Sequence, residues 1–305
     1  MANSKKTANL RSMVPLYIML IPAVTLVIIF NYIPMAGIII AFQKFIPAKG
    51  MFGDQQWVGL ANFVKITKYP DIGRVLYNTV YIAILKIVLG FIVPIIISIL
   101  INEIRSKFLK RIVQTAVYLP FFLSWVVLGG IFKDILSTEN GIVNQMLVKV
   151  LHIEPIFFLG SNTWFPITVT LTHVWKEFGF GTVVFLAAIT NIDPQLYESA
   201  YMDGANRWQR TRYITLPGMK MVIVLVGVLS LGNILNAGFD QIFNLYSPIV
   251  YRSGDILDTF VYRLGIIQAQ YSLATAIGLL KSLVSCLIIS LSYFLAVRYT
   301  DYRIF

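Results

Sequence analysis

The stretch that decides the fold reads Glu198-Ser-Ala-Tyr-Met-Asp-Gly-Ala205, then eight residues, then Ile214-Thr-Leu-Pro217. It is polar and partly charged, yet it lies between two strongly apolar segments of the chain. Long apolar segments joined by a short polar connection are typical of helices that cross a membrane and meet in a water-exposed loop.

Composition supports this class independently. Of the 305 residues, 57% are hydrophobic and only 13% are charged, and the mean hydropathy is +0.75. These values are far too apolar for a soluble domain. The formal charge of +11 comes from short basic clusters beside apolar runs, a pattern that suits anionic lipid headgroups and excludes nucleic-acid binding.

Apolar runs long enough to cross a hydrocarbon core of about 30 Å predict an all-α polytopic membrane protein with six transmembrane helices. Pro22 and Pro34 predict a kink or an exit from the membrane near Asn31. The fourth run contains charged side chains, and its hydropathy comes from the apolar residues on either side of them. The expected spans are Val14 to Phe42, Tyr77 to Ile101, Ile112 to Phe132, Phe165 to Thr190, Pro217 to Gly238 and Ser272 to Val297.

Lysines and arginines in the short loops set the expected orientation. In a six-span arrangement they fall on one side, which places both termini and the 198–217 stretch in the cytoplasm of a cell-membrane protein. Residues 1–13 are then a cytoplasmic tail rather than a cleaved signal. The residues concerned are Lys5, Lys6, Arg11, Arg105, Lys107, Lys110, Arg111, Arg207, Arg210, Arg212, Lys220, Arg298 and Arg303.

Two short helices at an angle are expected in the connection between the fourth and fifth spans. Asp193 and Pro194 are typical of a helix start, so the first helix should run from Pro194 to about Met202 and the second from Asn206 to about Tyr213. Gly204 marks the bend, because glycine accepts a positive φ or a close backbone approach. Tyr197 adds apolar surface that a groove on a partner would accept.

This stretch resembles the cytoplasmic EAA signature of membrane subunits in binding-protein-dependent ABC importers of type I. The resemblance covers nearly the whole chain; Ser199 stands where the first alanine is usual. It implies a permease domain over 14–305, with its core at about 72–298 and a coupling loop at 191–217 that docks on an ATPase. The implied coupling residues are Glu198, Ala200, Tyr201, Asp203, Gly204, Ala205, Leu216 and Pro217.

Two further stretches, Asn31-Tyr-Ile-Pro34 and Phe239-Asp-Gln-Ile-Phe-Asn-Leu245, are similar to the branch that imports oligosaccharides. The resemblance therefore implies a carbohydrate solute, a second permease subunit, two ATP-binding subunits and an extracytoplasmic solute-binding protein. ATP hydrolysis belongs to the partner, because this chain has no phosphate-binding loop and is not expected to be an enzyme.

Polar residues at the end of the fifth span are candidates for the solute path. Asn233, Asn236 and Asp240 recur at spacings of three and four, which predicts one helical face, and Gln241 follows. Amides and a carboxylate beside the aromatic residues Phe239, Phe243 and Tyr246 suit the hydroxyls and ring faces of a sugar. Hydrogen bonds that only join helices remain an equal alternative.

Four charged residues lie inside the expected spans, where such groups are costly. Lys176 and Glu177 are neighbours on one helix and are expected to meet different partners. Lys86 and Lys281 lie two to three turns inside their outer ends, so snorkelling toward the surface is favoured over a substrate role.

The outer loops, Lys133 to Trp164 and Phe239 to Tyr271, are long enough to form a docking surface. Contacts to an external binding protein are expected at Phe157, Phe158, Trp164, Tyr251, Arg252 and Asp255.

Other classes of protein fit less well. His152 and His173 stand far apart and Cys286 is alone, so neither a metal site, a cofactor nor a disulfide is expected. A membrane enzyme would have to use Lys176 and Glu177 without a nucleophile. A secondary transporter or channel for small solutes remains the alternative, although the chain has no convincing internal repeat.

Overall fold

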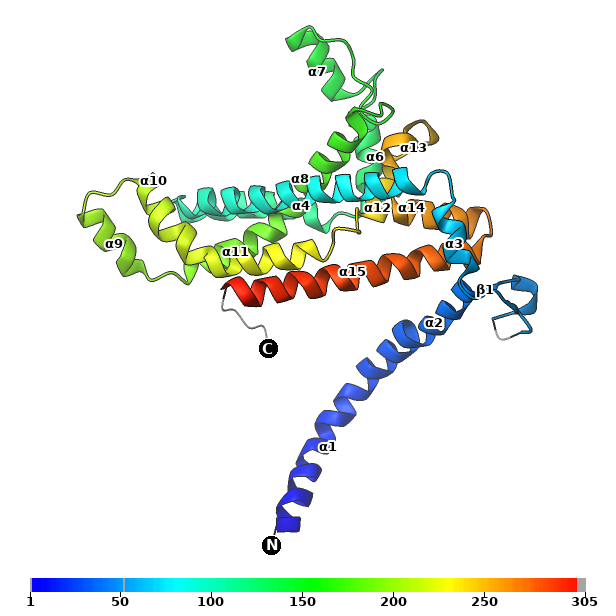
Figure 1. Ribbon diagram of the computed structural model, residues 1–305. Helices are drawn as coiled ribbons and strands as arrows, with labels where there is room; N and C mark the ends of the chain where they lie inside the picture. Colours follow the sequence, from blue (N-terminus) through cyan, green and yellow to red (C-terminus); the bar gives the residue numbers. More distant parts are fainter. Residues whose placement is uncertain (1, 52, 301–305) are drawn as a thin grey trace. The chain divides into compact units, whose positions relative to one another are not determined.

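The computed structural model describes residues 2–51 and 53–300. The chain divides into two compact units, Met1–Lys68 with Leu264–Leu279, and Tyr69–Arg263 with Leu280–Phe305. Helices dominate both units, and the strands described are one pair of two residues each (Figure 1). The prediction of an all-α protein is therefore confirmed.

The first unit begins with a long apolar helical segment. It comprises α1 (Ala2–Val27), the π-helical turn η1 (Ile28–Tyr32), α2 (Ile33–Met35) and the 3₁₀ segment η2 (Ala36–Phe42). The 29 residues Val14–Phe42 have the length and hydropathy of a membrane span. The hydrogen-bonding pattern changes around Asn31, where Ile33 N donates to Ile28 O just before Pro34. The sequence predicted an irregularity at this point.

A small folded hairpin follows in the same unit. Strands β1 (Gln43–Lys44) and β2 (Gln56–Trp57) pair in antiparallel register, with η3 (Pro47–Lys49) between them and α3 (Ala61–Thr67) after them. The buried Asn62 amide donates to Ala41 O at 2.8 Å and to Gln43 O at 3.1 Å. Phe45 N donates to Ser272 Oγ at 2.9 Å, which joins the hairpin to the later segment of this unit.

The second unit is built around α8 (Trp164–Thr190). Helix α4 (Ile72–Asn102) packs along it, and α11 (Leu216–Leu231) contacts both. Thr168, Thr170 and Thr172 on α8 are buried, and each hydroxyl donates to the carbonyl four residues earlier, at 2.7–2.9 Å. Polar side chains can therefore lie inside the bundle without an unpaired hydrogen bond.

The remaining helices extend from this bundle. At one end it leads to α9 (Pro194–Met202) and α10 (Arg207–Arg210), and at the opposite end lie α12 (Phe239–Leu245), α13 (Tyr251–Gly254) and α14 (Leu257–Tyr262) (Figure 1). The other elements of this unit are α7 (Ile142–Leu151), η5 (Thr211–Thr215) and η6 (Pro248–Val250), while η7 (Arg263–Ile267) and α15 (Tyr271–Thr300) have residues in both units. An apolar core centred on Phe165, Val169 and Ile242 holds the second end together.

Within the described residues, four helical segments qualify as membrane spans by length and composition: Val14–Phe42, Ile72–Asn102, Arg207–Leu231 and Tyr271–Phe294. A bent pair of helices would make a fifth. The expected fourth span is present as the 27-residue helix α8, but it does not qualify. One side of it is buried against other helices, with Phe165, Val169 and Phe185 in the core, while Leu171, Trp175 and Phe180 are exposed.

The expected third span, Ile112 to Phe132, is not one continuous helix. Helix α5 (Lys107–Tyr118) leads into the 3₁₀ turn η4 (Leu119–Phe122), and α6 (Trp125–Ile135) then continues at 103° to the preceding segment. Pro120 cannot donate a backbone hydrogen bond, and Ser124 Oγ accepts from Val127 N at 3.3 Å to cap α6. The prediction of one unbroken helix here is wrong.

Lys176 on α8 closes this break. Its Nζ donates to the Phe121 carbonyl at 3.1 Å and lies 5.1 Å from the centre of the Phe121 ring. The same ammonium is 3.0 Å from Glu177 Oε1, so the two neighbours pair with each other. The expectation of separate partners is wrong, because the flexible lysine stem lets both charges reach one point despite their adjacent backbone positions.

We expect Lys176→Met to lower the stability of the protein by about 1–3 kcal/mol, because the half-buried Phe121 carbonyl and the Glu177 carboxylate both lose a donor. Thermal unfolding of the purified protein in detergent measures the effect. The double variant Lys176→Met, Glu177→Gln is the control, and it should recover part of the loss by removing the unpaired charge. An unchanged unfolding temperature in the single variant would show that other contacts stabilise the bent segment between α5 and α6.

Candidate functional site

The loop between α8 and α11 has the two-helix form that the sequence predicts. Helix α9 occupies Pro194–Met202, and Asp193 Oδ1 caps it by accepting from Gln195 N at 2.9 Å. Gly204 has φ +78°, in the left-handed region that favours glycine, and it turns the chain between the two helices. Asn206 and Gln209 then form a reciprocal capping box at the start of α10.

The second helix does not end at Tyr213. Residues 207–231 form one continuous helical segment, and Leu216-Pro217 lies inside it rather than at its entrance. The π-helical turn Thr211–Thr215 precedes Pro217, and Leu216 N donates to Thr211 O five residues earlier. A proline inside a helix removes one hydrogen bond, and this wider turn accommodates it.

The loop exposes large apolar side chains. Met202 is 83% exposed, Tyr201 68% and Trp208 67%. Glu198 and Asp203 are also exposed, whereas Ala200 and Ala205 are half-buried. A hollow of about 450 Å³ is lined by Tyr197, Glu198, Tyr201, Met202 and Arg210. Exposed apolar surface with charged groups at its edge is typical of a protein docking site.

Internal contacts keep the loop stiff. The Tyr197 hydroxyl lies 2.9 Å from Thr215 Oγ1, which ties α9 to the turn before α11. The Arg210 guanidinium lies 5.9 Å from the centre of the Tyr201 ring. A tether between α9 and the long helix means that a force on α9 reaches α11 directly.

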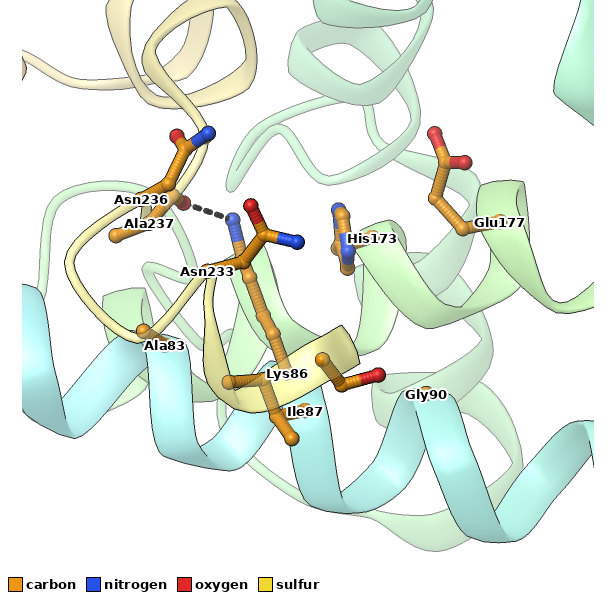
Figure 2. A pocket seen from close by; sticks show the side chains of 11 residues that line it. Ala83, Lys86, Ile87, Gly90, His173, Glu177, Asn233, Asn236 and Ala237 are labelled. Atoms are coloured by element: carbon orange, nitrogen blue, oxygen red, sulfur yellow. Dashed lines mark hydrogen bonds between the residues drawn. The ribbon is translucent and has the colours of Figure 1, made fainter. Parts of the chain in front are cut away.

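A second candidate site is an open cavity of about 360 Å³ in the second unit, lined by polar and apolar residues. Lys86 reaches it from α4, His173 and Glu177 come from α8, and Asn233 and Asn236 come from the segment after α11 (Figure 2). Ala83, Ile87, Gly90, Ser230, Ala237 and Gly238 complete the lining. Amide, ammonium, imidazole and carboxylate groups here supply both hydrogen-bond donors and acceptors to one space.

The four predicted solute-path residues do not share one helical face. Helix α11 ends at Leu231, an irregular segment follows to Gly238, and α12 starts at Phe239. Asn233 and Asn236 line the cavity. Asp240 is exposed in the first turn of α12, and Gln241 is buried, with Nε2 donating to Val169 O at 2.7 Å and Thr172 Oγ1 at 2.8 Å. The break at Gly232 separates residues that an unbroken helix would have aligned.

The predicted aromatic partners of these residues pack among themselves. Phe239 and Phe243 stack at 5.2 Å between ring centres, and Tyr262 contacts Phe243 at 4.9 Å. None of them lines the cavity. Trp125 and His173 instead stack near it, with 6.3 Å between ring centres and 8° between planes.

Neither Lys86 nor Lys281 snorkels to the surface. Lys86 is 5% exposed and donates to Ala237 O at 2.6 Å and to Gln241 Oε1 at 2.5 Å. Lys281 Nζ lies 2.5 Å from Asp258 Oδ1. Both snorkelling predictions are wrong, because internal acceptors, which the sequence alone does not place, are within reach of these ammonium groups.

The predicted outer contacts fall into two groups. Phe157, Trp164 and Arg252 are exposed, and Phe158 packs edge-on against Trp164. Asp255 is 3% exposed, because the Arg263 guanidinium and the Thr259 hydroxyl both bind its carboxylate. It is therefore not free to contact a partner.

Tyr246 and Tyr251 lie beside this ion pair, with 5.2 Å between their ring centres. Burial, followed by the charges of Tyr251 and Asp255, raises the pKa of the Tyr246 phenol, which therefore stays neutral. The Arg263 guanidinium also lies 4.5 Å from the centre of the Tyr251 ring, so the ion pair and the two tyrosines form one cluster.

No group of three or more metal-ligating side chains occurs among the residues described. The lysines and the glutamate near the cavity are engaged in the contacts given above. Among the described residues, the 191–217 loop and the cavity therefore lie at opposite ends of the helical segment Arg207–Leu231.

Comparison with known proteins identifies the family. Residues 86–302 match the family model described as "Binding-protein-dependent transport system inner membrane component". Protein LplB of Bacillus subtilis (strain 168) is 37% identical over 95% of this chain and 91% of its own length. The polygalacturonan/rhamnogalacturonan transport system permease protein YteP of the same organism is 38% identical over 95% and 90%.

A solved structure agrees with these relatives. The crystal structure of a bacterial ABC transporter involved in the import of the acidic polysaccharide alginate contains a chain that is 37% identical, with a TM-score of 0.88. The match covers 97% of this chain and 99% of that one. The chain described here therefore belongs to the inner membrane components of binding-protein-dependent transport systems.

Proposed function

We propose that this chain is one membrane-spanning subunit of an ATP-driven oligosaccharide importer and forms half of its translocation pathway. The exposed, stiff loop at 191–217 carries the proposal, because it presents apolar side chains that a soluble partner would cover. Names of relatives support the solute class, since they include permeases for polygalacturonan/rhamnogalacturonan and arabinooligosaccharides.

The partners follow from the same family. The loop docks on an ATP-hydrolysing subunit, two of which drive the importer, and a second permease subunit completes the pathway. The loop and both termini lie in the cytoplasm. A solute-binding protein delivers cargo to the outer surface, and this is supported by a related alginate transporter whose structure includes a periplasmic protein bound to an alginate pentasaccharide.

The docking role is proposed for Glu198, Ala200, Tyr201, Asp203, Gly204 and Ala205. Tyr201 and Met202 would enter the partner, with Glu198 at the edge of the hollow. Leu216 and Pro217 act differently from the loop residues, because they lie in the continuous helix that leads from the loop into the bundle. Their proposed role is to transmit the motion of the loop.

The solute path is proposed to pass Asn233 and Asn236, whose amides face the cavity. Asp240 and Gln241 lie outside the cavity. Asp240 would contact solute at the exposed start of α12, and Gln241 would support the cavity wall through its hydrogen bonds to Lys86 and α8. A secondary transporter is not favoured, because the relatives depend on binding proteins and the Lys176–Glu177 pair is already neutralised.

We expect Gly204→Val to leave the chain folded and inserted but to weaken association with the ATPase at least ten-fold. A branched residue is strained at φ +78°, whereas no neighbouring atom lies within 4 Å of the added Cβ. Co-purification of the ATPase and ATP hydrolysis in the eluate measure the effect.

Gly204→Asn is the matched control, because asparagine tolerates the left-handed region. It should retain most of the ATPase. Equal co-purification with glycine, valine and asparagine would contradict the docking role of this bend.

We expect Asn236→Ala to reduce solute uptake several-fold while ATPase association stays normal, because the cavity loses a hydrogen-bonding amide. Asp240→Ala, which changes an exposed carboxylate outside the cavity, should have the smaller effect. Uptake of labelled galacturonate oligosaccharide into proteoliposomes that contain the complete transporter measures both. A larger loss with Asp240→Ala would place the path along the outer face of α12 instead.

A further inference from the structure

The wall of the cavity includes a break in a helix. Between the end of α11 at Leu231 and the start of α12 at Phe239 the backbone follows no regular helix, and Gly238 has φ +88°. Asn233 N and Asn236 N still find acceptors in Ser230 O and Asn233 O, at 3.0 and 2.8 Å. A break in a helix leaves some carbonyls without a helical partner, and each one that is buried must be paired elsewhere.

The Ala237 carbonyl is such a group. Ala237 is fully buried, and Lys86 Nζ donates to its oxygen at 2.6 Å. Across the part of the chain that the structure describes, no other donor to this oxygen is found. A lysine on α4 thus supplies the hydrogen bond that a continuous helix would have supplied.

The same ammonium is held in place from two sides. It also donates to Gln241 Oε1, and the amide nitrogen of Gln241 donates to Val169 O and Thr172 Oγ1 on α8. The side chain of Gln241 therefore uses its oxygen for Lys86 and its two N–H groups for α8. These contacts join α4, the break, α12 and α8 in one network beside the cavity.

The space around the ammonium is closely fitted. A Cβ added to Gly238 would lie 3.2 Å from Lys86 Nζ. Glycine at this position therefore serves both the positive φ and the approach of the lysine. The positive φ and the short distance to the ammonium both favour glycine at this position.

We propose that Lys86 is a positioning residue for transport, which fixes segment 232–238 and with it the two amides, Asn233 and Asn236, that face the cavity. The part that concerns solute rests on the proposed function. Lys176 provides a parallel within the same unit, since it closes the break of the third predicted span in the same way. One lysine holds each of these two broken segments.

Hydrogen–deuterium exchange of the full transporter in detergent tests the positioning. In Lys86→Met, backbone amides of residues 232–238 should exchange about ten-fold faster or more, because the break loses its anchor, while amides of residues 220–231 keep their rate. Unchanged exchange at 232–238 would overturn the proposal.

Two further variants separate positioning from general loss of stability. Lys281→Met removes another paired lysine, bound to Asp258, and should leave exchange at 232–238 at the wild-type rate. The double variant Lys86→Met/Gln241→Leu removes both partners of the side-chain hydrogen bond. Exchange at 232–238 should stay fast in it, because the Ala237 carbonyl still lacks a donor. Fast exchange in Lys281→Met, or recovery in the double variant, would contradict the proposal.

The effect on transport is measured by ATP hydrolysis of the complete transporter and its binding protein as galacturonate or alginate oligosaccharide is added. We expect Lys86→Met to raise the half-saturating concentration several-fold and to change the maximal rate less than two-fold, with partial rescue by Lys86→Arg. An equal loss of maximal rate and no change in half-saturation would assign Lys86 to stability alone. A wild-type transporter that responds to neither probe contradicts the proposed solute class, and exchange then decides the role of Lys86.

Discussion

The hydrogen bond from Lys86 to the Ala237 carbonyl is the contact on which the cavity depends. Without a donor at this buried oxygen, the break between Leu231 and Phe239 would leave a carbonyl unpaired, which costs several kcal/mol in an apolar setting. The break in turn places Asn233 and Asn236 on the cavity wall. A charged residue that looks expensive in the sequence therefore makes an irregular backbone possible.

The parts of the protein that local sequence determines were predictable. Capping by Asp193, the proline after it and Gly204 are signals within a few residues of each other, and the helix Pro194–Met202 has the predicted bounds. The long apolar runs also form helices, except where the third is broken after Phe122 and the fifth ends at Leu231. The irregular hydrogen bonding near Asn31 follows from Pro34, because proline has no N–H to donate to the preceding turn.

The parts that distant contacts determine were not predictable from periodicity. Asn233, Asn236 and Asp240 fit a helical spacing, but the helix ends before them, and the donor that permits this is about 150 residues away in the chain. The same holds for the third expected span, where Lys176 binds the Phe121 carbonyl. Lys86, Lys176 and Lys281 stand out in the sequence as costly charges within apolar runs, but hydropathy does not say which oxygen each one meets.

The 191–217 loop and the cavity lie at the two ends of one stiff element. The helical segment from Arg207 to Leu231 has 25 residues, and at 1.5 Å per residue it is about 37 Å long. One end is tied to α9 through Tyr197 and Thr215, and the other ends at the break that Lys86 holds.

A helix transmits displacement along its axis with little loss, whereas an irregular segment absorbs it. Movement of the loop by a partner would therefore pass unchanged through α11 and be taken up at residues 232–238, where the amides face the cavity. In the proposed importer, the strength of the Lys86 contact then decides how far the cavity wall follows the ATPase.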